Sequence, residues 1–188
     1  EQGVAAIWSD LNEPQVFLYA EYDELAKTVH SDGERTFPDT SVHNLYANLE
    51  NRATFEALLR HRPNQRPWIL SRAGWAGIQR HAAVWTADCT SAWEHLRVTV
   101  PMLLNLGMSG IPFVGSDIGG FFKDCTPELF TRWLEMAVFT PFCRDHTCDG
   151  TADQEPWAFG AEVEAISRRF INKRYELLPY LYDLAYDA

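Results

Sequence analysis

The sequence is poor in basic residues and lacks long apolar runs, and both shortages exclude classes of protein. Only 16 Lys and Arg stand against 26 Asp and Glu, so the formal net charge is −10. This charge repels phosphate and argues against a nucleic-acid or anionic-membrane partner. No apolar run approaches the ~18 residues of a membrane-spanning helix. The chain begins at Glu1 rather than at a methionine, and we expect no signal peptide within it. We therefore expect a piece of a larger protein. The sequence does not decide the cellular compartment, although it slightly favours the cytoplasm.

Cysteine is also scarce. The four cysteines form no C-x-x-C pair and have no histidine at zinc-ligand spacing, and their density is below that of a disulfide-stapled domain. Free or buried thiols are therefore expected, although an even number would permit disulfides. The sequence predicts neither a metal nor another cofactor. The cysteines are Cys89, Cys125, Cys143 and Cys148.

What the chain does contain is a recurrent unit. A short apolar run ends in a polar residue, and a longer stretch with helical spacing follows. The apolar runs are 4–8, 67–70, 82–85, 111–114 and 138–142. The polar residues at their ends are Asp10, Arg72, Asp88, Asp117 and, for the last run, Arg144, Asp145 and His146. Continuous apolar runs are typical of strands buried on both faces of a parallel sheet.

Helices are predicted between these strands. One spans 45–59, with Leu45, Leu49, Phe55 and Leu59 on its apolar face. A second begins at a capping box formed by Ser91 and Glu94, and a third at Thr126 with Pro127 in the first helical position. The last spans 161–186, where Pro179 should kink or split it. Tryptophans of such proteins are usually core residues, as we expect of Trp68, Trp93 and Trp133.

Five strand–helix units in a row predict an α/β fold with a parallel sheet. A doubly wound sheet and a (β/α)8 TIM barrel both fit. The first strand leads into Asp-Leu-Asn-Glu-Pro rather than a glycine fingerprint, which gives little support to a nucleotide-binding doubly wound fold. Charged residues at the ends of several strands favour an enzyme barrel. Because a full barrel takes ~250 residues, the chain should hold roughly the last five units of an incomplete one.

Carboxylates and aromatic rings at the strand ends indicate a sugar site. Carboxylates accept hydrogen bonds from hydroxyl groups, and rings cover the apolar faces of a pyranose. A retaining glycosidase needs two carboxyl groups about 5–5.5 Å apart, one as nucleophile and one as acid/base. Asp10 and Asp88 are the candidates, with Arg72 expected across the mouth of the site from Asp10. Taken alone, an aspartate at a strand end is more often a turn or helix-cap residue, and only the recurrence of such residues at successive strand ends favours a functional role.

Four ordered stretches resemble glycoside hydrolase family 31. Ile7–Pro14 is similar to its W-x-D-M-N-E signature, and three later motifs match it in order. These are Ser71–Gly77, Trp85–Trp93 and Gly115–Phe121; the stretches 141–146 and 174–182 are similar to its last barrel strand and exit helix. The resemblance implies that residues 1–188 are the C-terminal portion of a (β/α)8 catalytic domain, with the family's flanking β-domains absent from this chain.

The resemblance also implies roles for single residues. Asp10 would be the nucleophile and Asp88 the acid/base. Substrate-binding roles fall on Trp8, Phe17, Arg72, Trp85, Asp117, Phe121 and His146. Two positions depart from the family pattern. Leu11 stands where methionine is common, and Ala87-Asp88-Cys89 replaces Gly-Asp-Asn, which removes a side-chain amide next to the acid/base.

The function these features predict is a retaining α-glycosidase, first of all an α-glucosidase acting on an oligosaccharide or α-glucoside. An α-xylosidase or α-transglucosylase would use the same two aspartates. A metal-dependent barrel hydrolase using Asp88, Asp117 and His146 is a second class, disfavoured by the absence of an H-x-H pair. A non-catalytic sugar-binding fragment is a third. For catalysis we expect the chain to require the rest of its own polypeptide.

Overall fold

A computed structural model describes residues 4–14 and 27–187, which fall into two compact units, Glu1–Val84 and Trp85–Ala188. No helix in the described ranges is long and apolar enough to cross a membrane. The α/β prediction is confirmed, because strands pair in parallel within each unit and helices separate them in sequence.

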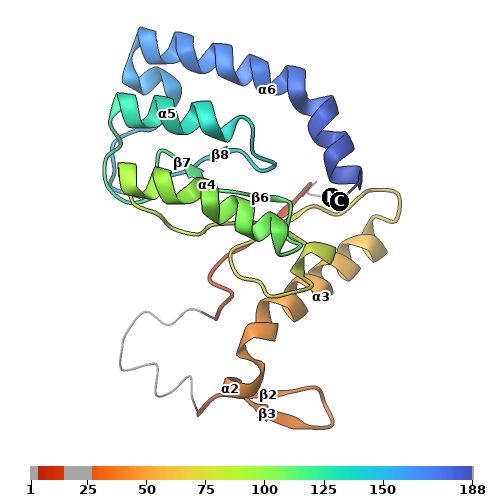
Figure 1. The fold of residues 1–188 in the computed structure, drawn as a ribbon. Helices are drawn as coiled ribbons and strands as arrows, with labels where there is room; N and C mark the ends of the chain where they lie inside the picture. The colour runs from red at the N-terminus through yellow and green to blue at the C-terminus, as the bar shows by residue number, and fades with distance from the viewer. Residues whose placement is uncertain (1–3, 15–26, 188) are drawn as a thin grey trace. The chain divides into compact units, whose positions relative to one another are not determined.

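The first unit is built on parallel strands. β1 (Ile7–Ser9) pairs with β4 (Ile69–Ser71), and β4 pairs with the start of β5 (Ala83–Trp85). All residues of β4 and β5 are buried, as their continuous apolar runs predict. The other elements are α2 (Asp39–Val42), the 3-10 turns η2 (His43–Leu45) and η3 (Ile78–Arg80), and α3 (Tyr46–His61). Parallel strands need a long crossover connection, and α3 lies within the one from β1 to β4 (Figure 1).

A β-hairpin in this unit was not expected from the sequence. β2 (Val29–Ser31) and β3 (Thr36–Pro38) are antiparallel. Asp32 forms the turn, since its Oδ1 accepts hydrogen bonds from the amides of Glu34 and Arg35 at 3.0 and 2.7 Å. The same hydrogen bonds lower the pKa of Asp32. Figure 1 shows the hairpin beside α2, and Asp39 N–H donates to the Thr28 carbonyl there at 2.9 Å.

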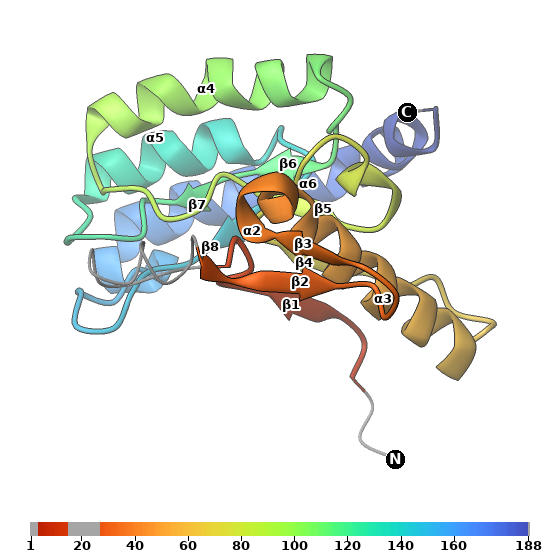
Figure 2. The same cartoon turned by 90° about the horizontal axis from the view of Figure 1, so that it is seen from below.

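The second unit packs three helices. α4 (Trp93–Met108), α5 (Pro127–Ala137) and α6 (Ala161–Asp187) run beside the short strands β6 (Val114–Gly115), β7 (Asp117–Ile118) and β8 (Arg144–Asp145) (Figure 2). The 3-10 turn η4 (Pro156–Phe159) precedes α6. The core lies around α5, where Phe130 and Trp133 are almost completely buried against Val138 and Val163. Arg174 of α6 ties it to the end of α5 by donating to the carbonyls of Val138, Thr140 and Pro141 at 2.7–3.0 Å.

Several helix predictions are confirmed. Thr126 caps α5 by accepting from the Leu129 amide at 3.3 Å, with Pro127 in the first turn. α6 is one continuous helix with Pro179 inside, so it is not split, although its ribbon changes direction toward the C-terminus in Figure 1. Trp133 is a core residue, as predicted.

Other predictions are wrong. Ser91 does not cap α4, because Ala92 occupies the cap and the Ser91 hydroxyl donates to the Lys123 carbonyl at 3.0 Å. The run 138–142 is not a strand, since Val138 closes α5 and the strand forms later, at β8. Trp68 and Trp93 are 39% and 48% exposed rather than in the core.

The predicted apolar face of α3 is also wrong. Leu45, Leu49 and Leu59 are exposed, and the buried residues are Ala47 and Asn51. Asn51 is buried because its amide donates to the Ala47 carbonyl and to Ser71 Oγ, at 2.7 and 2.8 Å. A hydrogen-bonded polar residue therefore anchors this helix to β4, and hydrophobic spacing cannot reveal that.

Candidate active site

The first half of the predicted site lies at the ends of β1 and β4. Asp10 follows β1 directly, and Arg72 follows β4, which pairs with β1 in parallel. Paired parallel strands end at the same edge of a sheet, so the two side chains meet. Arg72 Nη1 lies 3.5 Å from Asp10 Oδ1, and Arg72 Nε donates to Glu13 Oε1 at 2.8 Å. The expected approach of Arg72 to Asp10 is confirmed.

A buried polar network fixes this edge. Asn12 donates to Ser71 Oγ at 2.9 Å and to Glu50 Oε2 at 2.8 Å, and it accepts from the Ala73 amide at 3.0 Å. Ser71 Oγ donates in turn to the Ala73 carbonyl at 2.7 Å. These contacts hold the backbone on both sides of Arg72. The orientation of its guanidinium therefore depends on a network that is itself hydrogen-bonded.

The second half of the predicted site lies in the second unit. The Arg144 guanidinium donates to Asp117 Oδ1 through Nε at 3.1 Å and also through Nη2. It lies over the Trp85 ring, 5.0 Å from the ring centroid. Phe121 stacks on His146, with the ring centroids 5.2 Å apart. The structure thus brings Trp85 and Asp117 together through Arg144, and Phe121 together with His146.

The loop that carries Asp88 is tied to the same region. The amides of Phe121 and Phe122 both donate to the Cys89 carbonyl, at 2.7 and 2.9 Å. Cys89 is buried, and this burial raises the pKa of its thiol to about 11. All four cysteines are free, as expected. Because Cys89 is a protonated thiol at neutral pH, it is not poised as a nucleophile beside Asp88.

Positive backbone φ values adjoin both predicted catalytic aspartates. Leu11, directly after Asp10, has φ +55°, and Ala87, directly before Asp88, has φ +58°. Lys123 is the only other non-glycine residue with positive φ in the described ranges. Non-glycine residues in this conformation are strained and cluster at functional sites. The strain is therefore a structural signal that supports the two positions chosen from the sequence.

A third carboxyl group close to this region has a shifted pKa. Desolvation, opposed by a hydrogen bond from Gln154 at 3.1 Å, raises the pKa of Asp145 to about 6. Asp145 lies in β8, directly before His146. Gln154 also donates to the Ile118 and Gly120 carbonyls, at 2.7 and 3.3 Å. Asp145 is thus linked through Gln154 to the backbone of the loop after β7.

The structure places the sequence-predicted residues unevenly. Trp8, Asp10 and Arg72 lie at the edge formed by β1 and β4, and Trp8 is 48% exposed. Trp85, Asp88, Asp117, Phe121 and His146 belong to the second unit. Phe17 lies outside the described residues. Because Asp10 and Asp88 belong to different units, their pairing as two catalytic carboxyl groups stays a prediction.

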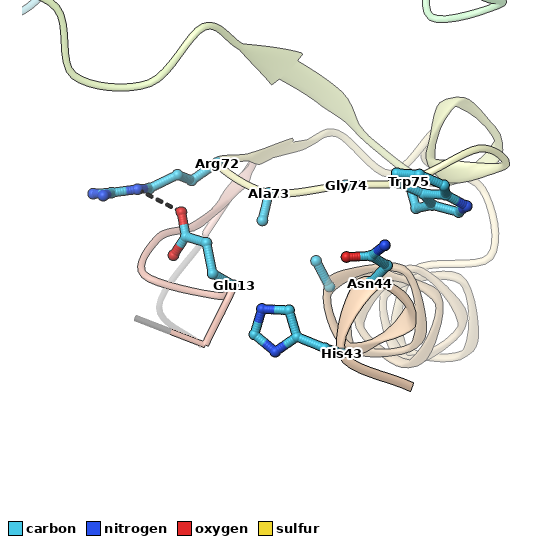
Figure 3. Close-up of a pocket in the computed structure, with 8 residues that line it drawn as sticks. Glu13, His43, Asn44, Arg72, Ala73, Gly74 and Trp75 are labelled. Carbon is cyan, nitrogen blue, oxygen red and sulfur yellow. Dashed lines mark hydrogen bonds and ion pairs between the residues drawn. The ribbon is translucent and has the colours of Figure 1, made fainter. Parts of the chain in front are cut away.

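Two strand-end residues to which the sequence assigned no role contact the predicted site residues. Glu13 contacts Arg72 directly (Figure 3), and Arg144 is the ion-pair partner of Asp117. Both lie next to or within the strand-end motifs, so their position in the sequence already indicated a place near the site. The sequence could not predict which side chain each of them contacts. Asp117 is fully buried and bound by Arg144, so any sugar contact would share its carboxylate with that arginine.

Parallel strands with helices between them and charged residues at the strand ends are the arrangement of an enzyme barrel. The family model for the glycosyl hydrolases family 31 TIM-barrel domain matches residues 1–184. The chain therefore belongs to glycoside hydrolase family 31, and its fold is part of the TIM-barrel domain of that family.

Known proteins agree with this assignment. "Alpha-glucosidase 2" of Bacillus thermoamyloliquefaciens is 42% identical over 186 residues, which are 99% of this chain and 24% of that protein. A "Probable glucan 1,3-alpha-glucosidase" of Arabidopsis thaliana is 43% identical over 96% of this chain and 19% of that protein. A solved structure of a family 31 dextranase from Flavobacterium johnsoniae is 34% identical with a TM-score of 0.90, covering 99% of this chain and 24% of its own. The chain thus spans about a fifth to a quarter of these relatives.

Proposed function

We propose that the intact protein is a retaining α-glucosidase that removes α-linked glucose from an oligosaccharide or α-glucoside. The observation that carries the proposal is the 42% identity to an α-glucosidase over 99% of the chain. Residues 1–188 supply the C-terminal portion of the catalytic barrel. Because the chain spans 24% of that relative, activity requires the rest of the polypeptide as well.

The mechanism proceeds in two displacements. The Asp10 carboxylate attacks the anomeric carbon while Asp88 donates its proton to the glycosidic oxygen, so the C–O bond to the leaving group breaks and a glucosyl ester forms on Asp10. Asp88, now ionised, takes a proton from water, and the resulting hydroxide attacks the anomeric carbon and releases Asp10. The contact between Arg72 and Asp10 supports this role, because the guanidinium places a positive charge beside the carboxylate that attacks.

The remaining predicted residues bind the sugar. Trp8, Phe17, Trp85 and Phe121 supply aromatic surface, and Arg72, Asp117 and His146 supply hydrogen-bonding groups. In the part of the chain that the structure describes, no group of three His, Cys, Asp or Glu side chains is arranged to hold a metal ion. Nothing in that part favours the metal-dependent alternative over the carboxylate mechanism.

The first experiment follows product stereochemistry in the intact protein. Proton NMR during hydrolysis of an aryl α-glucoside should show the α-anomer of glucose first, because two inversions at one carbon give retention. Initial release of the β-anomer would overturn the double displacement. An aryl α-xyloside hydrolysed with a higher kcat/KM would replace the glucosidase by the xylosidase, and transfer of glucose to sugar in place of water would indicate the transglucosylase.

Two variants separate the roles of the carboxyl groups. Asp10→Ala should abolish hydrolysis of every substrate, because no ester can form. Asp88→Ala should lose hydrolysis of an oligosaccharide far more than that of a nitrophenyl α-glucoside, whose leaving group needs no proton. Asp153→Ala is the matched control, an exposed aspartate outside the site. Undiminished activity of Asp10→Ala would show that the nucleophile has been misassigned.

A further inference from the structure

The loop after β8 contains a buried polar side chain, Gln154, to which the proposed mechanism gives no role. Gln154 is 4% exposed. Its Nε2 donates to the Ile118 and Gly120 carbonyls at 2.7 and 3.3 Å, and to Asp145 Oδ1 at 3.1 Å. Because all three partners are acceptors, only the NH2 group of the amide can face them. The direction of this side chain is therefore fixed by the backbone around the end of β7.

The loop after β7 is fitted closely to Gln154. Gly119 lies between the two residues whose carbonyls Gln154 binds, and its φ is +84°. A Cβ on Gly119 would lie 2.7 Å from Gln154 Nε2 and 2.8 Å from its Cδ. Position 119 therefore requires glycine both for its backbone conformation and for the side chain packed against it. Since the two are in direct contact, the loop cannot shift toward Gln154 without displacing it.

The same loop holds the segment that carries Asp88. The amides of Phe121 and Phe122 both donate to the Cys89 carbonyl, at 2.7 and 2.9 Å. Cys89 directly follows Asp88 in the chain. A carbonyl that accepts from two successive amides is restrained in position and in direction. The loop after β7 therefore fixes the backbone next to Asp88.

The loop after β7 is anchored on both sides of this contact. On one side, Thr147 Oγ1 and the Cys148 amide donate to the Phe121 carbonyl at 3.1 and 3.0 Å. On the other side, Gln154 binds the carbonyl of Gly120, the residue directly before Phe121. Gln154 thus supplies the side-chain donor where the loop leaves β7.

We propose that Gln154 is a positioning residue for Asp88. The inference rests on the proposed function, in which Asp88 is the acid/base. Gln154 holds the loop after β7, two amides of that loop hold the Cys89 carbonyl, and the Asp88 carboxyl group is thereby aimed at the glycosidic oxygen. Misplacement of a catalytic group by about 1 Å can cost roughly 10²-fold in rate. Loss of the Gln154 contacts should therefore slow the donation of the proton.

The test uses two substrates with the same sugar and different leaving groups. Nitrophenoxide leaves without a proton, whereas phenoxide depends far more on the acid. The measured quantity is the ratio of kcat/KM for nitrophenyl α-glucoside to kcat/KM for phenyl α-glucoside, on the intact protein. Gln154→Met keeps the length of the side chain but removes the donor. It should raise this ratio about tenfold, within the roughly 10²–10⁴-fold that a general acid contributes.

Two further variants of Gln154 grade the effect. Gln154→Glu should raise the ratio more than Gln154→Met does, because its ionised carboxylate would face three acceptor oxygens. Gln154→Asn retains the amide on a shorter side chain and should raise the ratio less. If the first two variants do not fold, Gln154→Asn takes their place in the comparison.

The ratio separates positioning from a loss of folded protein. A variant that only lowers the amount of folded enzyme lowers both values of kcat/KM equally and leaves their ratio unchanged. Gln65→Met is the matched control, the same substitution at an exposed glutamine outside the site, and should keep the wild-type ratio. Asp88→Ala should raise the ratio most, since it removes the acid. If it does so while the Gln154 variants keep the wild-type ratio, the inference is overturned.

Hydrogen exchange separates the inference from the proposed function. In Gln154→Met the amides of Phe121 and Phe122 should exchange faster than in the wild type, because the loop that holds them is released. The Phe142 amide, which donates to the Val114 carbonyl in the same unit, is the control and should not change. If the wild type hydrolyses neither glucoside, or if Asp88→Ala leaves the ratio unchanged, the proposed function fails by itself. The exchange then decides the role of Gln154, and equal rates at both amides would overturn it.

Discussion

Ala87 shows how a single residue can carry strain next to a proposed catalytic group. Its φ of +58° is left-handed, a conformation that costs an L-residue roughly 1–2 kcal/mol, and it directly precedes Asp88. Family 31 resemblance places glycine at this position, and glycine has no such cost. The left-handed backbone explains the preference for glycine in physical terms, and it makes alanine the strained alternative.

Ala87→Gly should therefore stabilise the protein. Relief of the left-handed strain outweighs the greater flexibility of glycine in the unfolded chain, which leaves a net gain of about 0.5–1 kcal/mol. Urea unfolding of the intact protein, at an unchanged m-value, measures it. Ala53→Gly is the control with the opposite sign: Ala53 is exposed within α3, where glycine costs about 1 kcal/mol. A loss of stability in Ala87→Gly would show that the conformation at 87 is not strained.

At the scale of elements, the close approach of β6 to the chain before β8 depends on glycine. A Cβ on Gly115 would lie 2.0 Å from the Phe142 carbonyl oxygen, a backbone atom that cannot turn aside. The same two segments are hydrogen-bonded, since the Phe142 amide donates to the Val114 carbonyl at 3.2 Å. A side chain at 115 would therefore push β6 away from the segment leading to Arg144.

Gly115→Ala should destabilise the protein by about 1–3 kcal/mol, the usual cost of forcing extra atoms into a packed site. The matched control is Gly107→Ala in α4, where a Cβ meets nothing within 4 Å and alanine should gain about 0.5–1 kcal/mol. Thermal unfolding of the two variants beside the wild type decides the matter. Equal midpoints for both would mean that the two segments separate without cost.

Predictions of where a helix begins and which face it buries were correct only where the residues involved are close in sequence. Thr126 and Pro127 start α5 because a hydroxyl cap and a proline act within one turn of helix. Ser91 and Glu94 offered a similar local pattern, yet the Ser91 hydroxyl bonds the distant Lys123 carbonyl instead. The buried face of α3 likewise follows a hydrogen bond from Asn51 to Ser71, twenty residues away in sequence. A local sequence pattern therefore fails to predict the structure where a residue distant in sequence forms the hydrogen bond instead.

For the molecule as a whole, the exposed apolar surface of α4 has a consequence. Met108 and Leu104 are 87% and 64% exposed, and Val98 and Val100 on the same helix are also exposed. Exposed apolar patches of this kind mark surfaces that contact other protein. Residues 1–188 produced alone should consequently associate in solution and bind a hydrophobic dye more strongly than the intact protein does.

Size-exclusion chromatography and anilinonaphthalene sulfonate fluorescence of residues 1–188 provide the measurement. A double variant, Leu104→Lys with Met108→Lys, should reduce both association and dye binding, because charge on the helix opposes burial. Glu94→Lys, in the first turn of the same helix, adds the same charge and controls for added charge alone. A monomeric wild-type chain with no dye binding would show that this face needs no partner.

The sequence by itself determined the class of fold, the order of the strand–helix units and the identity of the strand-end residues, including Asp10, Arg72 and Asp88. These follow from patterns within a few residues: apolar runs, caps, and motifs that share one segment of chain. Only the tertiary structure decided which side chains meet. The pairing of Arg72 with Glu13 and Asp10, of Arg144 with Asp117, and of His43 with Asp39 depends on distances across the fold. Charges and hydrogen bonds act through space, so the partner of each residue appears only once the chain has folded.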